Sequence, residues 1–352
     1  MPADEYTADS IPVVDDLLAS VRRRPGMFTG DTSTGDGALH LVLEIVSNAV
    51  DQAMLGRCTR IDVRVDADDH VTISDDGPGI PAHRLTDLLE RLSNRPTVDG
   101  HRPHVHLSPI GLGLPVSNQL SDPLIIDTIH ASEHASVRYA GGVLHTPLRV
   151  VLTTRPSGTT IRLRPDPQIF SCTRVPRDRL TRRLEDLTYL IPGLTLSWSF
   201  TGRGDAGLAS CVRAELGDPL GDIATHQGDY PTSDGPITVD VALAWHRHPG
   251  HRGGPQIDSF ANLLRTEDGQ HVDGLRAGVR AFLPDHSDAQ RFDGLVAAVA
   301  VVLADVRYGN PTKDKLTSAA AKPAVKAATL AALQAWAARN PEAAATLHAR
   351  GA

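Results

Sequence analysis

Cysteine and long apolar runs are what the sequence most clearly lacks. Its 352 residues include three cysteines, Cys58, Cys172 and Cys211, which are too widely spaced for a metal-binding Cys-x-x-Cys pair and too few for a disulfide framework. No stretch approaches the roughly 20 apolar residues of a membrane-spanning helix. The acidic start MPADEYTADS lacks the basic and apolar segments of a secretion signal. We therefore expect a soluble, cytoplasmic protein with reduced cysteines and no membrane partner.

An excess of positive charge is also absent. Lys and Arg together number 35 against 42 Asp and Glu, which gives a formal net charge of −7. Obligate nucleic-acid binding requires clustered Lys and Arg to contact phosphates. The triplet Arg22-Arg23-Arg24 is a local basic patch, but such a patch is more typical of a solvated helix end. The composition therefore leaves DNA binding without support.

The length favours two domains, because 352 residues exceed the usual size of a single domain. A Gly- and Asp-rich stretch from Gly202 to Asp234 is typical of a linker around a short helix. We place the boundary there, which predicts domains at 1–217 and 218–352. The first is predicted to be an α+β two-layer sandwich with a mainly antiparallel sheet, and the second a smaller mixed α/β domain.

Periodicity predicts the elements of both halves. The surest is a helix over 38–55, where apolar residues recur at the helical period and Gly56 marks the stop. Two alternating runs at 61–65 and 71–73 predict a hairpin. The remaining predicted elements are helices at 84–92, 113–120, 177–190, 274–282 and 318–339, strands at 124–129, 136–139, 150–152, 160–163 and 237–245, a strand or loop at 257–263 and an apolar run at 295–303.

The predicted helix over 38–55 carries three polar residues on one face. Glu44, Asn48 and Asp51 follow one another at spacings of four and three, so they project in the same direction. A carboxylate there has the chemistry to deprotonate water, and the Asn48 carbonyl has the chemistry to bind Mg²⁺ that bridges phosphates. From the helix alone, a solvated face is the more ordinary interpretation.

Two glycine-containing segments change that balance. Asp75-Asp76-Gly77-Pro78-Gly79-Ile80 follows a predicted strand, where a carboxylate can accept a hydrogen bond from an exocyclic amino group of a base. Gly111-Leu112-Gly113 precedes a predicted helix, whose unpaired amides attract an anion. Each segment is weak evidence alone. Their order and spacing, together with Glu44-x-x-x-Asn48, are specific.

This combination resembles the GHKL, or Bergerat-fold, ATPases, and within them the amino-terminal ATPase and transducer region of DNA gyrase B. The resemblance extends over nearly the whole chain. The segments that carry it are 24–28 (RPGMF), 44–53 (EIVSNAVDQA), 75–81 (DDGPGIP), 157–159 (SGT), 268–271 (DGQH) and 312–316 (TKDKL).

The resemblance implies a Bergerat ATP-binding fold followed by a transducer domain, with ATP and Mg²⁺ as ligands. It implies that Glu44 is the catalytic base, Asn48 the magnesium ligand, Asp75 the adenine anchor and Thr159 its water-bridged partner. Lys313 resembles the transducer lysine that contacts the γ-phosphate. Further nucleotide contacts are implied for Asp51, Gly79, Ile80, Gly111, Leu112 and Gly113, and for Tyr6 on an amino-terminal arm that closes a homodimer.

The phosphate end departs from the family pattern. A lysine-containing segment is replaced by Arg95-Pro96-Thr97-Val98, a phosphate-binding amide is lost at Pro109, and a glutamine is replaced by Pro311. Each lost charge-assisted hydrogen bond costs about 1.5–3 kcal/mol, so we expect slow hydrolysis.

Three functions stay open on these grounds. The first is a dimeric Mg·ATP-hydrolysing protein that resembles the gyrase B clamp and is not a complete topoisomerase on its own. The second is a biosynthetic ligase or kinase that uses the same pocket, and the third a nucleotide sensor or gyrase modulator with weak catalysis. DNA and a gyrase A-like protein are conceivable partners that no sequence feature supports.

Overall fold

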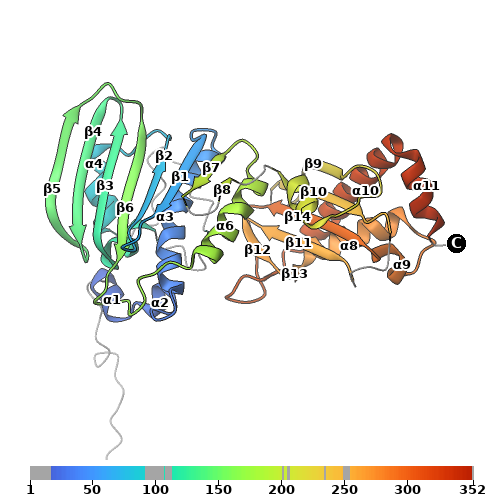
Figure 1. Ribbon diagram of the computed structural model, residues 1–352, viewed down its shortest axis with the longest axis horizontal. Coiled ribbons are helices and arrows are strands. Elements are labelled where there is room, and N and C mark those ends of the chain that lie inside the picture. Colours follow the sequence, from blue (N-terminus) through green and yellow to red (C-terminus); the bar gives the residue numbers. More distant parts are fainter. Residues whose placement is uncertain are drawn as a thin grey trace, which may run out of the picture. The chain divides into compact units, whose positions relative to one another are not determined.

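The computed structural model describes residues 17–91, 107, 113–199, 202–203, 207–233, 235–248 and 254–350 (Figure 1). The described residues form two compact units. One contains most of the chain up to Arg177, and the other contains Asp178 onwards together with Ala53–Ile61. The boundary at residue 217 stays a prediction.

A large sheet runs through the first half of the chain, in the order β5-β4-β3-β6-β2-β1-β7-β8. Its central pairs, β2 with β6, β6 with β3, β3 with β4 and β4 with β5, are antiparallel, as predicted. The strands are β1 (Arg60–Val65), β2 (Val71–Asp75), β3 (Ser121–His130), β4 (Glu133–Ala140), β5 (Val143–Leu152), β6 (Gly158–Pro165), β7 (Thr195–Trp198) and β8 (Gly202–Arg203).

Helices cover one face of this sheet (Figure 1). They are α1 (Leu17–Arg23), α2 (Gly26–Thr29), α3 (Asp36–Met54), α4 (Ala82–Glu90) and α5 (Leu114–Gln119), with α6 (Arg177–Leu190) following β6. The expected helices over 38–55, 84–92, 113–120 and 177–190 are therefore confirmed. The triplet Arg22-Arg23-Arg24 lies at the end of α1, where Arg23 and Arg24 are exposed. Arg22 is half-buried, because its guanidinium donates to Asp166 at 2.7 Å and to the Gln119 carbonyl at 2.6 Å.

Helix α3 is buried more completely than an amphipathic pattern predicts. Of its 19 residues 13 are buried, including the predicted stripe from Leu39 to Val50, whereas Met54 is exposed. Glu44 and Asp51 belong to the buried set and Asn48 is exposed. The solvated-face interpretation of this helix is therefore wrong for the two carboxylates.

The second unit contains a five-stranded sheet in the order β12-β11-β14-β10-β9. Strand β14 pairs antiparallel with β10 and parallel with β11. The strands are β9 (Ala224–Tyr230), β10 (Ile237–Trp245), β11 (Gln256–Ala261), β12 (Leu264–Thr266) and β14 (Leu295–Val302), and a separate small sheet joins β13 (Asp268–Gly269) to β15 (Lys315–Leu316). Strand β9 corrects the expectation that 202–234 is only a linker with a short helix.

Burial on both faces explains the apolar run of β14. Leu295 and Val299 pack into a core with the helices α8 and α10, whereas Val296 and Ala300 pack on the opposite face with α7. A strand covered on both sides has no reason to alternate polar and apolar residues. The helices of this unit are α7 (Leu208–Glu215), α8 (Gln270–Phe282), α9 (Asp288–Phe292), α10 (Ala321–Arg339) and α11 (Pro341–Ala349).

A buried ionic network connects α6 to this second sheet. Arg265 donates to Asp186 at 2.6 Å and also contacts Asp258, while Arg183 donates to Asp186 at 3.2 Å. The Asp258 carboxylate also accepts from the Cys211 thiol at 3.3 Å. Burial beside Asp258 raises the pKa of that thiol, so Cys211 stays protonated. Cys58, Cys172 and Cys211 are all free, as expected.

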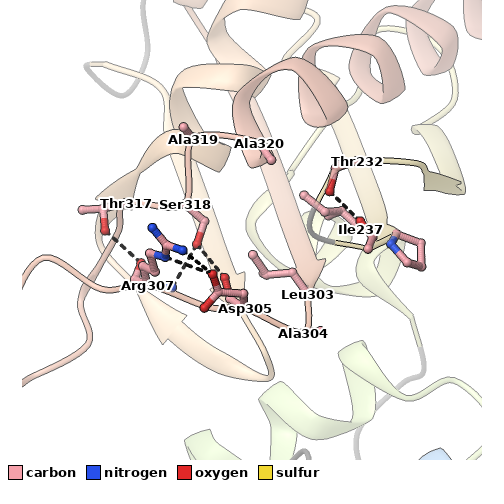
Figure 2. A pocket seen from close by; sticks show the side chains of 12 residues that line it. Thr232, Ile237, Leu303, Ala304, Asp305, Arg307, Thr317, Ser318, Ala319 and Ala320 are labelled. Carbon is pink, nitrogen blue, oxygen red and sulfur yellow. Dashed lines mark hydrogen bonds and ion pairs between the residues drawn. The ribbon is translucent and has the colours of Figure 1, made fainter.

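A small cavity of about 180 Å³ lies where the chain enters α10 (Figure 2). Its wall is tightly bonded: Thr317 Oγ1 donates to the Arg307 carbonyl at 3.0 Å, and the Arg307 amide donates to Ser318 Oγ at 2.9 Å. These bonds close the base of the 309–316 loop, which carries Lys313.

No described helix is long and apolar enough to cross a membrane.

Two glycines let α8 and α10 approach closely. A Cβ added to Gly278 would lie 2.5 Å from Thr329 Cβ, and one added to Gly274 would lie 2.6 Å from the Lys322 carbonyl oxygen. We expect Gly278→Ala to lower the free energy of unfolding of the second unit by about 1–3 kcal/mol, because the helices must separate. Chemical denaturation measures it. Gly217→Ala is the control, since its Cβ meets nothing within 4 Å; equal stability of both variants would contradict the prediction.

Candidate functional site

Three aligned rows of side chains cross the strands β2, β6 and β3 on the helix-covered face. The rows are Val71, Leu163 and Leu124; Ile73, Ile161 and Ile126; and Asp75, Thr159 and Thr128. The first two rows are wholly apolar and buried. The third is wholly polar, although it lies on the same face by the two-residue period of a strand. The core therefore ends in a polar row at one end of the three strands.

Glycines allow the Asp75–Ile80 turn to lie against this row. Gly79 has φ +72°, and a Cβ there would be 2.0 Å from the Ile129 carbonyl oxygen. Gly158 has φ +156°, and a Cβ there would be 2.5 Å from the Asp75 carbonyl oxygen. Neither position accepts a side chain without moving the backbone, so both glycines are required by close approach. His130 Nδ1 lies 2.8 Å from the Pro78 carbonyl oxygen and contacts the turn from β3.

Asp75 is a mostly buried carboxyl with few partners. The Gly77 amide donates to Asp75 Oδ1 at 2.9 Å, and the Thr159 amide also lowers the pKa of this carboxyl. Burial outweighs both bonds, and the neighbouring Asp76 charge adds to it, so the pKa of Asp75 is raised to about 6. A group whose pKa is displaced by burial at the end of a core is a candidate for ligand binding.

Glu44 of α3 and Gly113, the residue that precedes α5, lie within hydrogen-bonding distance of each other. The Gly113 amide donates to Glu44 Oε2 at 2.9 Å, and Glu44 is 9% exposed. Gly113 precedes α5 with φ +72°, and this left-handed conformation is one that glycine adopts without strain. The amide that was expected to contact a phosphate thus binds the carboxylate that was expected to act on water.

Asn48 has the donor chemistry for the implied magnesium ion. Its amide nitrogen donates to the Glu44 carbonyl at 3.2 Å, which leaves the side-chain oxygen as the ligating atom. Mg²⁺ is commonly bound by one or two protein oxygens together with substrate phosphates and water. An exposed carboxamide one helical turn from a buried carboxylate fits that requirement. Asp51 lies on the next turn and is buried.

Lys313 lies in the second unit, in a loop that is tightly bonded to itself. Its φ is +59°, an unusual conformation for a residue with a side chain. Its amide donates to the Asn310 carbonyl at 3.2 Å, and both Asn310 and Thr312 bind the Asp314 carboxylate. Those two side-chain bonds lower the pKa of Asp314. The loop therefore holds Lys313 in one defined backbone conformation.

Several expected contacts lie outside the described residues. These are Tyr6, Gly111 and Leu112, together with the altered positions Arg95 and Pro109. Sequence reasoning also missed one member of the polar row, Thr128. The signal was present, because Thr128 continues the alternation of Leu124 and Ile126 and is the first polar residue in it.

Two protein families match consecutive parts of the chain. Residues 34–169 match the model of the histidine kinase-, DNA gyrase B- and HSP90-like ATPases. Residues 207–351 match the DNA gyrase B model. The first match contains Glu44, Asn48, Asp75 and Thr159, and the second contains Lys313.

Curated relatives that match the chain are DNA gyrase B proteins. DNA gyrase B of Archaeoglobus fulgidus is 31% identical over 98% of this chain and 58% of its own length. DNA gyrase B of Campylobacter jejuni is 28% identical over 96% of this chain and 47% of its own length. The chain thus spans about half the length of these relatives.

Solved structures agree on the fold. The 43K ATPase domain of Thermus thermophilus gyrase B, in complex with an aminocoumarin, superposes with a TM-score of 0.77 at 25% identity. The match covers 95% of this chain and 93% of the Thermus thermophilus chain. The gyrase B protein of Myxococcus xanthus has a TM-score of 0.75 at 24% identity, with 95% of this chain and 99% of that chain covered. The expected two-layer α/β fold followed by a mixed α/β domain is confirmed.

The raised pKa of Asp75 predicts a pH-dependent stability. A carboxyl with a pKa of about 6 in the fold and 3.8 otherwise stabilises the folded state when it is protonated, and this contribution is lost as the pH rises through 6. An Asn at this position stays neutral at every pH. We expect the stability of Asp75→Asn minus that of the wild type to become more positive, by about 2–3 kcal/mol, between pH 4 and pH 7.5.

Denaturant unfolding at the two pH values measures this change. The difference between variant and wild type carries the test, because any hydrogen bond lost to the amide is lost at both pH values. Glu133→Gln, which changes an exposed glutamate at the start of β4, is the control for removal of a carboxylate. A stability difference for Asp75→Asn that is the same at both pH values would disprove the assignment.

Proposed function

Because residues 34–169 match the model of the histidine kinase-, DNA gyrase B- and HSP90-like ATPases and residues 207–351 match the DNA gyrase B model, we propose that this protein binds Mg·ATP and hydrolyses it slowly. The observation that carries the proposal is the polar row at the end of the sheet core. Asp75 and Thr159 are paired there across β2 and β6, and they are the two residues to which the resemblance assigns the adenine base.

The adenine half of the proposed site rests on Asp75. Among the described residues its carboxylate has backbone amide partners from Gly77 and Thr159, and a carboxylate has about four acceptor positions. It therefore keeps the capacity to accept from an exocyclic amino group. Gly79 and Ile80 bring backbone close to the same row.

The phosphate half of the proposed site rests on Glu44 and Asn48. A bound Mg²⁺ would neutralise phosphate charge, with Asn48 as its ligand on the protein. Glu44 would orient the attacking water and accept its proton, a role that suits a buried carboxylate held in place by the Gly113 amide. Lys313 would contact the γ-phosphate, and the substitutions at Arg95, Pro109 and Pro311 are the reason to expect slow turnover.

Dimer formation is part of the same proposal. The resemblance assigns the amino-terminal arm with Tyr6 to contacts with a second copy of the chain when ATP is bound. Light scattering with and without a non-hydrolysable ATP analogue tests this. Analysis of the nucleotide products in the same samples separates hydrolysis from ligase or kinase chemistry, because AMP or a phosphorylated acceptor does not come from simple hydrolysis.

Glu44→Gln tests the catalytic assignment. The amide of glutamine can still accept the hydrogen bond from Gly113, but it cannot accept a proton from water. We expect the hydrolysis rate to fall by about 100-fold or more, with the affinity for a non-hydrolysable analogue changed by less than about threefold. Steady-state phosphate release and calorimetry measure the two quantities.

The control is Glu133→Gln, which changes an exposed glutamate at the start of β4 and should leave both quantities unaltered. Undiminished hydrolysis by Glu44→Gln would exclude Glu44 as the base. Loss of analogue binding as well as hydrolysis would instead make Glu44 a binding residue.

A further inference from the structure

Thr128 is the one member of the polar row without an assigned role. It lies in β3 directly opposite Thr159 and is 1% exposed. Its hydroxyl contacts three groups: the Ile80 amide nitrogen at 2.8 Å, Thr159 Oγ1 at 3.1 Å and the Gly158 carbonyl oxygen at 3.4 Å. A buried hydroxyl with three polar neighbours on two separate segments is more than a packing residue.

The donor or acceptor character of its neighbours fixes the hydrogen bonds of the Thr128 hydroxyl. The Ile80 amide can only donate, so the Thr128 oxygen must accept from it. The single hydroxyl hydrogen of Thr128 then goes either to Thr159 Oγ1 or to the Gly158 carbonyl. In both cases Thr128 joins the Asp75–Ile80 turn on one side to the start of β6 on the other.

Other polar contacts of the turn are the bond from the Gly77 amide to Asp75 Oδ1 and the contact of His130 Nδ1 with the Pro78 carbonyl oxygen, and neither involves the Ile80 amide. Gly79 packs its backbone directly on the Ile129 carbonyl, and this contact is steric and gives no direction to the Ile80 amide. The hydroxyl of Thr128 supplies that direction. The Thr128 hydroxyl also orients the Thr159 hydroxyl, since Thr128 Oγ1 and Thr159 Oγ1 are 3.1 Å apart.

We propose that Thr128 is a positioning residue of the nucleotide site, which holds Ile80 and Thr159 in place and thereby sets the affinity for the adenine base. The inference rests on the proposed function, because it presumes that this end of the sheet receives adenine. Thr128 acts through its neighbours and leaves the phosphates and the attacking water untouched.

The sheet contains a matched control for this hydroxyl. Ser74 Oγ and Thr160 Oγ1 are 3.0 Å apart across the same two strands, β2 and β6, one position along the chain from Asp75 and Thr159. Successive residues of a strand point to opposite faces, so this pair lies on the face away from the polar row. Thr160→Val removes a cross-strand hydroxyl pair of the same kind without touching the site.

The test compares Thr128→Val, which keeps the shape and removes the hydroxyl, with Thr160→Val and Thr128→Ser. Calorimetry with ADP and with a non-hydrolysable ATP analogue gives affinities, and steady-state hydrolysis gives kcat and KM. For Thr128→Val we expect both affinities to fall by the same factor, about five- to tenfold, with KM raised accordingly and kcat unchanged. Thr160→Val should match the wild type, and Thr128→Ser should recover affinity to within about twofold.

Each other result has a definite meaning. Unchanged affinity in Thr128→Val, a loss confined to the ATP analogue, or no recovery in a folded Thr128→Ser would each overturn the positioning role. A wild-type protein that binds neither ADP nor the analogue would refute the proposed function itself and the inference with it. If Thr128→Val does not fold, Thr128→Cys replaces it under the same criteria, because a thiol is a weak acceptor.

Discussion

The register of three antiparallel strands is the constraint on which the candidate site depends. Because β2, β6 and β3 pair without offset between Val71 and Asp75, residues that are far apart in the chain form straight rows across the sheet. A shift of one residue in any strand would turn its polar member to the opposite face. The two apolar rows pack against the helices and thereby fix the register, so the core determines the position of the third, polar row.

Burial gives the polar groups of the first unit their chemical character. Glu44, Asp51 and Asp75 are each largely removed from water, and burying a polar group is unfavourable unless it is hydrogen-bonded. Glu44 receives the Gly113 amide, and Asp75 receives the Gly77 and Thr159 amides. The compensation at Asp75 is incomplete, and its raised pKa is the result. A carboxyl that is incompletely satisfied by its own fold is suited to take a hydrogen-bond donor from a ligand.

The second unit is held by tight backbone packing and by ion pairs that include the buried Asp186. Gly274 and Gly278 bring α8 against α10, and the loop that carries Lys313 joins directly to the start of α10 through Arg307, Thr317 and Ser318 (Figure 2). Asp186 and Arg265 attach α6 to the same unit. Lys313 is therefore presented from a loop whose base is bonded to a long, well-packed helix.

The sequence by itself determined which elements form and which residue types carry the chemistry. The helix around Glu44, the turn after Asp75 and the antiparallel strands followed from periodicity and from glycine positions, because these are local properties of the chain. The resemblance to the GHKL ATPases followed from the order of short motifs. Strand β9 was not predicted, because most of its residues are polar and Gly228 lies within it. It also lies in a Gly- and Asp-rich stretch whose composition is typical of a linker.

Only the tertiary structure decided how these residues meet. The bond of Glu44 to the Gly113 amide, the raised pKa of Asp75 and the link that Thr128 makes between Ile80 and Thr159 all depend on the tertiary structure. Glu44 and Gly113 are 69 positions apart in the chain, and Thr128 and Thr159 are 31 positions apart. The local sequence around a residue does not indicate which distant residues it will contact. Burial and hydrogen-bond geometry arise when the strands pair and the helices pack, and the physical character of this site arises with them.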